Sequence, residues 1–63
     1  MQIGNRILKL RKLYNLSQEE LADKMDVARQ TISKWDLGET SPNLEEAKHL
    51  SKIFNVSLDE LTY

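Results

Sequence analysis

The stretch from Gln18 to Trp35 reads QEELADKMDVARQTISKW, and its apolar spacing governs how this part of the chain folds. Its first apolar residues keep the helical intervals of three and four positions: Leu21, Ala22 and Met25. Val27 then follows Met25 after only two positions, and the helical spacing resumes further on. A single helix would not change phase in this way. The sequence therefore predicts two short helices, about 18–25 and 29–36, joined by a tight turn.

The outward face of the second predicted helix carries side chains that can form hydrogen bonds: Arg29, Gln30, Ser33 and Lys34. A helix fits the major groove of duplex DNA, where each base pair displays a distinct set of donors and acceptors. Arg29 can donate two parallel hydrogen bonds to guanine, and Gln30 can both donate to and accept from adenine. Lys34, one turn further along, reaches a base edge or the backbone. We therefore predict that these four residues read bases.

Contacts with the DNA backbone are predicted at the starts of the same two helices. Unpaired amides at the start of a helix carry partial positive charge and favour phosphate. Gln18 lies at such a start, where its side chain can bind a phosphate and fix how deep the reading helix lies. Ala28 and Thr31 occupy the beginning of the reading helix, and we expect phosphate contacts there as well.

Three further helices are predicted around this pair. Apolar residues at steps of four, three and four mark a first helix that ends near Asn15: Ile3, Ile7, Leu10 and Tyr14. A fourth helix over 44–54 turns a second set inward: Leu44, Ala47, Leu50, Ser51 and Phe54. A short fifth helix begins at Leu58 and carries Leu61. No strand pattern occurs, so residues 1–63 are predicted to form one all-α domain of five helices.

Capping signals set the predicted helix boundaries. In a capping box, a side-chain oxygen accepts from an early amide, and a glutamate three residues on reaches back. Three pairs have this spacing: Ser17 with Glu20, Asn43 with Glu46, and Ser57 with Glu60. Gly38 ends the reading helix, because glycine takes the left-handed cap without strain. Pro42 then holds the connection to the fourth helix extended.

Length and composition exclude several classes of function. A chain of 63 residues without cysteine leaves no room for a large substrate cleft and offers no thiolate metal site. The single histidine, His49, has no accompanying nucleophile and acid, so we expect it on the surface and expect no enzyme, metal or cofactor. Trp35 is expected in the core. The apolar runs are too short for a membrane span or a signal peptide, which predicts a cytoplasmic protein.

The formal net charge of −1 hides an uneven distribution along the chain. Residues 1–35 contain seven Lys or Arg and four acids, which gives +3, whereas residues 36–63 contain two lysines and six acids, which gives −4. For binding to nucleic acid, the distribution of charge matters more than its total. The asymmetry favours a molecule with one face toward an anion and another turned away.

Three segments resemble the phage repressor and Cro-type helix-turn-helix family, the XRE-type regulators: 16–22 (LSQEELA), 27–36 (VARQTISKWD) and 56–61 (VSLDEL). The likeness covers nearly the whole chain. It implies a lambda-repressor-like DNA-binding domain of five helices, commonly dimeric, in a bacterial or phage transcriptional repressor associated with the nucleoid. It also implies that Gln18 supports the reading helix and that Arg11 pairs with Asp36.

The chain departs from the family pattern at the turn and in the loop after the reading helix. Asp26 stands where the family often has glycine, and Ala28 replaces a hydroxyl residue that would cap the reading helix. Two loop positions that are often basic or amide-bearing hold Leu37 and Glu39. The phosphate contacts of that loop are therefore expected from Thr40 and Ser41.

Three or four bases read by one domain are too few to single out a site in a genome, so we expect a homodimer on a palindromic operator. Two surfaces are alternatives for the dimer contact: the fifth helix with Leu58, Leu61 and Tyr63, or the first helix with Leu8 and Leu13. A second hypothesis for function is a protein-interaction module, such as the antitoxin of a toxin-antitoxin pair, that uses the acidic half of the chain. Salt separates the two hypotheses, because DNA binding weakens steeply as salt rises.

Overall fold

Five helices and no strand make up residues 3–62, the part of the chain that this computed structural model describes. The helices are α1 (Ile3–Leu13), α2 (Gln18–Met25), α3 (Arg29–Leu37), α4 (Leu44–Phe54) and α5 (Leu58–Thr62). The predicted all-α fold with five helices is confirmed. α1 ends just before Asn15, where a left-handed φ of 57° turns the chain, and α3 continues one residue beyond the predicted end. None of the helices in residues 3–62 is both long and apolar enough to cross a lipid bilayer.

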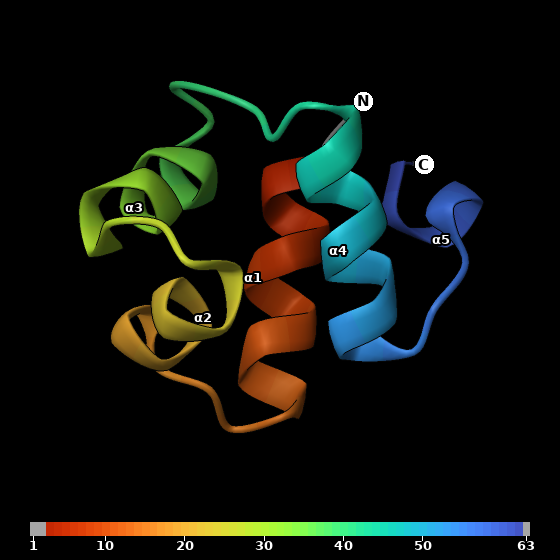
Figure 1. Cartoon of the computed structure of the whole chain (residues 1–63), viewed down its shortest axis with the longest axis horizontal. Helices are drawn as coiled ribbons and strands as arrows, with labels where there is room; N and C mark the ends of the chain where they lie inside the picture. The colour runs from red at the N-terminus through yellow and green to blue at the C-terminus, as the bar shows by residue number, and fades with distance from the viewer. Residues whose placement is uncertain (1–2, 63) are drawn as a thin grey trace.

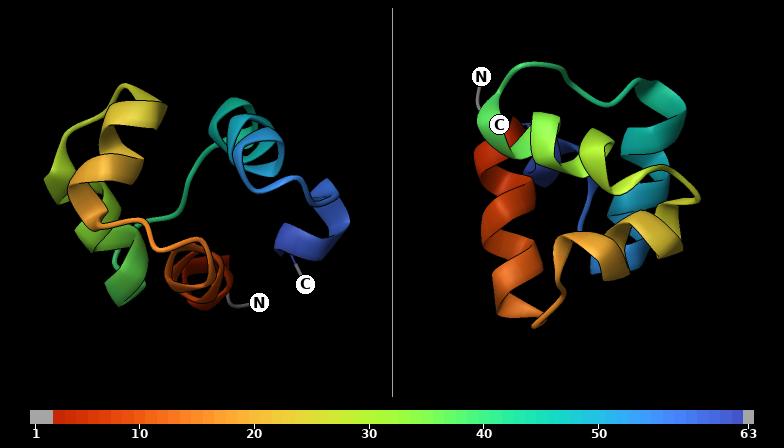
Figure 2. Two further views of the ribbon diagram at one scale, coloured as in Figure 1. Left: turned by 90° about the horizontal axis from the view of Figure 1, so that it is seen from below. Right: turned by 90° about the vertical axis from the view of Figure 1, so that its left-hand side faces the viewer.

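The other helices lie on two sides of α1 (Figure 1). α2 and α3 pack on one side, and α4 and α5 on the other, as the view from below in Figure 2 shows. α1 contacts α3 and α5, and α2 contacts α4. The loop 38–43 crosses one end of the molecule from α3 to α4. The pair of α2 and α3 therefore forms one face of the molecule, and no other helix covers it.

All five helices contribute apolar side chains to the core. Its buried members are Ile3, Ile7, Leu21, Ala22, Met25, Ile32, Trp35, Ala47, Leu50, Phe54 and Leu61. Trp35 is 2% exposed, which confirms its predicted place in the core. Full burial of one large apolar side chain stabilises a fold by about 1.5–3 kcal/mol. The end of α3 that carries Trp35 is therefore fixed by packing.

Leu44 does not point inward as predicted, and Tyr14 does so only in part. Leu44 is 60% exposed, because α4 meets the core only from Ala47, one turn further on. Tyr14 is 46% exposed and follows the end of α1. Its hydroxyl donates to the carbonyl oxygen of Phe54 at 2.7 Å, and its ring lies edge-on to the Phe54 ring. The prediction of inward packing is wrong for Leu44, whereas Tyr14 packs against a core residue and His49 is exposed on α4 as predicted.

α2 and α4 begin with complete capping boxes, as predicted. Ser17 Oγ accepts from the Glu20 amide at 3.0 Å, while the Glu20 carboxylate accepts from the Ser17 amide at 2.9 Å. The box at the start of α4 has the same two bonds at 2.8 Å each. The third predicted box is incomplete: the Ser57 hydroxyl accepts from the Glu60 amide, but the Glu60 carboxylate accepts from that hydroxyl at 3.4 Å.

α1 and α3 approach each other so closely at Gly4 that no side chain fits there. A Cβ atom at this position would overlap the carbonyl oxygen of Trp35. The C-terminal end of α3 is therefore seated directly on the backbone of α1. This contact places Asp36, the next residue along α3, beside the first helix.

Candidate nucleic-acid interface

α2 and α3 form a helix-turn-helix, seen from its outer side in the right-hand view of Figure 2. The turn depends on Asp26, which takes a left-handed conformation with φ 58° and ψ 44°. Its amide donates to the carbonyl oxygens of Ala22 and Asp23, and the Val27 amide donates to that of Ala22 at 3.0 Å. Aspartate is among the few residues other than glycine that tolerate this conformation. The break in apolar spacing marks the turn, as predicted.

The outer face of α3 presents the residues predicted to read bases. Arg29, Gln30 and Lys34 are exposed, whereas Ser33 is half-buried. The opposite side of α3 packs into the core, so helical periodicity directs these side chains outward. The predicted exposure of Arg29 and Gln30 is confirmed, and their contact with bases stays a prediction.

The start of α3 differs from the starts of α2 and α4. Its N-cap residue is Ala28, in extended conformation, and no side chain caps the helix. The amides at this start therefore lack the side-chain partner that Ser17 and Asn43 supply elsewhere. Thr31, whose amide donates to the Ala28 carbonyl oxygen at 3.0 Å, is half-buried. An anion at this start would meet unpaired N–H groups and the positive end of the helix dipole.

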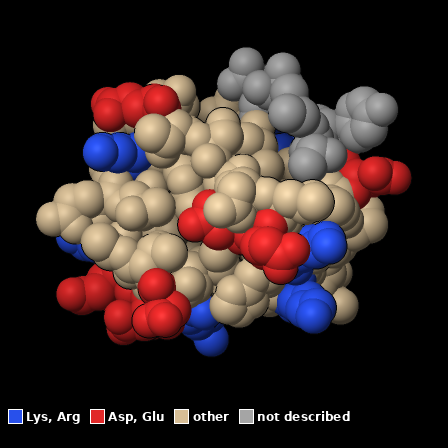
Figure 3. Space-filling view, turned by 45° about the horizontal axis from the view of Figure 1, so that its top comes forward, with Lys and Arg blue, Asp and Glu red and all other residues tan. Residues whose placement is uncertain are grey.

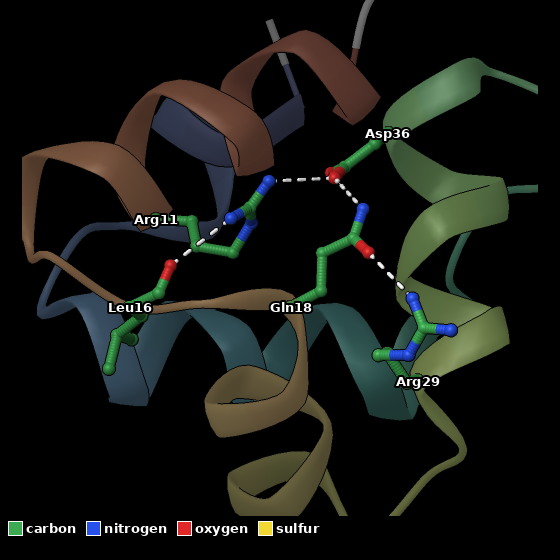
Figure 4. Close-up of polar contacts among 5 residues, drawn as sticks. All are labelled: Arg11, Leu16, Gln18, Arg29 and Asp36. Carbon is green, nitrogen blue, oxygen red and sulfur yellow. Dashed lines mark hydrogen bonds and ion pairs between the residues drawn. The ribbon is translucent and has the colours of Figure 1, made fainter.

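Four polar side chains form a network that links α1, α2 and α3 (Figure 4). Arg11 of α1 forms an ion pair with Asp36 of α3, with 2.8 Å between Nη2 and Oδ2. The same Oδ2 accepts from Nε2 of Gln18, at the start of α2, at 3.0 Å. Oε1 of Gln18 in turn accepts from Nη1 of Arg29 at 3.3 Å. Gln18 therefore lies between the two ends of α3 and supports it, as the resemblance implies.

The ion pair of this network is largely shielded from water. The side chains of Arg11 and Asp36 are 11% and 9% exposed. Arg11 also donates from Nη1 to the carbonyl oxygen of Leu16 at 3.1 Å, which ties the loop between α1 and α2 to the same group. Loss of one partner would leave the other charge buried and uncompensated. The pairing of Arg11 with Asp36 is confirmed, and it fixes the C-terminal end of α3 to α1.

The remaining predicted phosphate contacts lie beyond the C-terminal end of α3. Gly38 ends that helix with φ 76°, as predicted. Thr40 and Ser41 follow, exposed in the loop 38–43, and line a polar hollow of about 250 Å³ with the start of α1. The loop that carries these two hydroxyls and the N-cap residue Ala28 therefore lie at opposite ends of α3, with Gln18 between them.

Charge is mixed on the side of the molecule that carries the loop 38–43. Figure 3 brings this side forward and shows acidic and basic side chains interspersed with uncharged surface. The division of the sequence into a basic and an acidic half does not give this face a single sign of charge. This face therefore presents no broad basic field to an anion.

Sequence reasoning missed the side-chain partners of Gln18. It directed the carboxamide at phosphate, whereas the structure gives it Asp36 and Arg29 as partners and leaves it half-buried. Gln18 and Asp36 are far apart in sequence, and no periodic pattern connects them. Gly4 was missed for the same reason, because its role depends on where the end of α3 passes over α1.

Comparison with known proteins agrees with this geometry. Residues 7–61 match the helix-turn-helix family. The chain is 44% identical over 61 residues to the HTH-type transcriptional activator BcrR of Enterococcus faecalis, which covers 97% of this chain and 30% of that protein. It is 39% identical over 57 residues to an uncharacterised HTH-type transcriptional regulator of Methanocaldococcus jannaschii, covering 90% of this chain and 86% of the relative.

A phage protein is among the similar sequences. The cryptic phage CTXphi transcriptional repressor RstR of Vibrio cholerae is 30% identical over 61 residues, which cover 97% of this chain and 54% of the repressor. The chain thus spans about a third of the activator and about half of the phage repressor. The matched range contains the whole helix-turn-helix and the network behind it. The chain belongs to the helix-turn-helix family, in the XRE-type group that the sequence resembles.

Proposed function

We propose that residues 1–63 form one DNA-binding domain that regulates transcription by recognising a specific duplex sequence in the major groove. The observation that carries this proposal is the outer face of α3, where Arg29, Gln30 and Lys34 are exposed beside an uncapped helix start. Relatives named as a transcriptional activator and a transcriptional repressor support the same role. The protein acts in the cytoplasm, on the nucleoid.

In this proposal α3 enters the major groove with its N-terminal end foremost. Arg29 donates two hydrogen bonds to guanine, and Gln30 pairs with adenine through its carboxamide. Lys34 reaches a base edge or a phosphate one turn further along, and the hydroxyl of Ser33 is a further donor or acceptor for a base. Arg29 and Gln30 are adjacent in sequence, so the bases that they read lie next to or near each other.

Phosphates on the two sides of the groove hold α3 in place. Gln18, Ala28 and Thr31 serve the side at the start of α3, and Ala28 acts through its backbone N–H because it has no side-chain donor. Thr40 and Ser41 serve the other side. A helix of the nine residues of α3 is about 13 Å long, close to the roughly 12 Å width of the major groove. Ala28 and the loop with Thr40 and Ser41 flank opposite ends of α3, which suits contacts on opposite walls of the groove.

We infer that two copies bind a palindromic operator, because one domain reads too few bases for a unique site. Of the two predicted dimer surfaces, α1 leaves Leu13 74% exposed. On α5, Leu61 is fully buried and Leu58 is partly buried against the core, while Tyr63 lies outside the described residues. The exposure of Leu13 favours α1. Such a dimer represses transcription by occupying a promoter, which requires no contact beyond those with DNA.

Selection of bound sites from random duplexes tests this function. We expect an inverted repeat with guanine and adenine in each half-site, and with half-site centres about 10 base pairs or a multiple of that apart. The logarithm of the binding constant should fall linearly with the logarithm of salt concentration, with a slope of about −0.9 per neutralised phosphate. A selection that enriches no sequence would contradict the proposal. Salt-insensitive binding of a protein partner would then favour the alternative, a protein-interaction module such as an antitoxin.

A further inference from the structure

We propose that Asp36 is a positioning residue for base recognition: it orients the carboxamide of Gln18, which in turn holds the guanidinium of Arg29. This inference rests on the proposed function, because it concerns how the reading side chain is presented to DNA. It goes beyond it by assigning part of the specificity to a carboxylate whose side chain is only 9% exposed. A side chain so shielded acts on DNA through its neighbours rather than by direct contact.

The orientation of the Gln18 carboxamide follows from the chemistry of its two partners. An ionised carboxylate only accepts hydrogen bonds, so the NH2 end of Gln18 must face Asp36, at 3.0 Å from Oδ2. A guanidinium only donates, so the oxygen end must face Arg29, at 3.3 Å from Nη1. A flipped amide would place oxygen against carboxylate and NH2 against guanidinium. Asp36 thus selects one of the two amide orientations, and it is the one that attracts Arg29.

The carboxylate that makes this selection is itself immobilised. Its Oδ2 accepts from Arg11 Nη2 at 2.8 Å, and Arg11 is held by the Leu16 carbonyl oxygen at 3.1 Å. The close contact of Gly4 with the preceding residue of α3 fixes the backbone at the same place. Within residues 3–62, Oδ1 of Asp36 is buried without a hydrogen-bond partner, so both donors share Oδ2. Gln18 is therefore bound to the C-terminal end of α3 through a single acceptor atom, Oδ2 of Asp36.

Arg29 keeps enough donors to read a base while it is held. A guanidinium has five N–H donors in a fixed planar fork, and one of them is directed at Gln18. The others suffice for the two parallel hydrogen bonds that guanine accepts. The bond to Gln18 restricts the rotation of a long, exposed side chain before DNA arrives, which lowers the entropy lost on binding. In the described part of the chain, no hydrogen bond or ion pair of this network involves Gln30 or Lys34, so we expect the effect of Asp36 to be confined to the base pair that Arg29 reads.

The substitution Asp36→Asn tests this assignment, with Asp23→Asn as the control of equal charge change on the exposed side of α2. In Asp36→Asn, discrimination at one base pair per half-site should fall at least about fivefold, while discrimination at the other positions changes by less than about twofold. Because a neutral amide oxygen is a weaker and less selective acceptor than a carboxylate, NMR of the free protein should show a shift of the Gln18 side-chain NH2 signal toward weaker hydrogen bonding and greater mobility of Arg29 Nε–H. Asp23→Asn should change neither readout.

A second variant keeps the test valid if Asp36→Asn does not fold. Arg11→Met combined with Asp36→Leu replaces the shielded ion pair by apolar side chains, an exchange that proteins often tolerate. It leaves Gln18 and Arg29 chemically intact but without their anchor, so the same two changes are expected. A uniform loss of affinity at all positions, or an unchanged Gln18 signal, would overturn the proposal. If the wild-type chain selects no DNA sequence, the proposed function is wrong and discrimination between base pairs cannot be measured. The NMR signals of the free protein still decide whether Asp36 orients Gln18.

Discussion

The two ends of α3 are built in opposite ways. At the C-terminal end, Trp35 is buried and Asp36 pairs with Arg11. At the N-terminal end, Ala28 supplies no side-chain cap and Arg29 is exposed. The C-terminal end holds its carboxylate in a shielded ion pair, whereas the first amides of the N-terminal end have no side-chain partner. The difference teaches that a short reading helix can remain open at its tip because its other end is anchored.

The open end has a cost that the rest of the fold must offset. A missing N-cap side chain lowers stability by about 1 kcal/mol, and small domains have only a few kcal/mol in all. The complete capping boxes of α2 and α4 and the packing of Trp35 counter this loss. The packing and the ion pair that stabilise α3 thus lie at its C-terminal end.

The substitution Arg11→Ala should have the largest effect, because it releases the anchored end. Asp36 would keep a charge that is 9% exposed and lose its ion pair. We expect the free energy of unfolding to fall by about 3–5 kcal/mol. Urea unfolding followed by the fluorescence of Trp35, the single tryptophan, measures it. The exposed Lys12→Ala on the same helix should change stability by less than about 0.5 kcal/mol, and equal losses in both variants would show that the ion pair is not the anchor.

The substitution Arg29→Ala, at the N-terminal end of α3, should weaken DNA binding without changing stability. Specific DNA binding should weaken by about 1–3 kcal/mol and lose its preference at one base pair. Stability should stay within about 0.5 kcal/mol of the wild type, because the side chain is exposed. Titration of fluorescent operator DNA gives the first quantity and urea unfolding the second. Lys52→Ala on α4 removes the same charge, and a loss of base preference there would refute the role assigned to Arg29.

The substitution Ala28→Ser should make the open end resemble the starts of α2 and α4. A serine hydroxyl at the N-cap accepts from an amide in the first turn, so stability should rise by about 1 kcal/mol. Differential unfolding in urea measures the gain. Ala28→Val lacks the hydroxyl and should give no gain. If serine fails to stabilise, the start of α3 is already satisfied, and the contrast between its two ends is smaller than described.

The substitution Glu20→Gln should have the smallest effect on stability. It alters the capping box at the start of α2. Hydrogen bonds from Ser17, chiefly from its backbone amide, lower the pKa of Glu20 below its ordinary value. The charged form is therefore favoured in the folded state, and its stabilisation is present above the ordinary glutamate pKa and lost as pH falls through the lowered one. Unfolding experiments across the acidic range should show a shallower decline for Glu20→Gln than for wild type. An equal decline in both proteins would show that the charge of Glu20 does not stabilise the start of α2.

Local patterns predicted most of the helices, because apolar phase and capping act over a few residues. The break between Met25 and Val27 located the turn, and the spacing of Ser17 and Glu20 located the start of α2. Leu44 was misplaced because periodicity shows which side chains share a face of a helix, but not where along the helix the neighbouring packing begins.

The exposed residues of the candidate site could be predicted from the sequence, whereas the contacts that hold them in place could not. Exposure of Arg29 and Gln30 follows from the helical period once Trp35 is placed in the core. The contact of Gln18 with Asp36 depends on the crossing of three helices, which no local pattern encodes. The Gly4 contact depends on the same crossing.

The direct backbone contact at Gly4 sets the orientation of α3 relative to α1. Even a methyl group at Gly4 would overlap the Trp35 carbonyl oxygen and change the angle between α3 and α1. Since α3 is about 13 Å long, a small change in its tilt at the C-terminal end displaces its N-terminal end. A substitution at Gly4 would thus move the exposed side chains at the start of α3 without changing any of them.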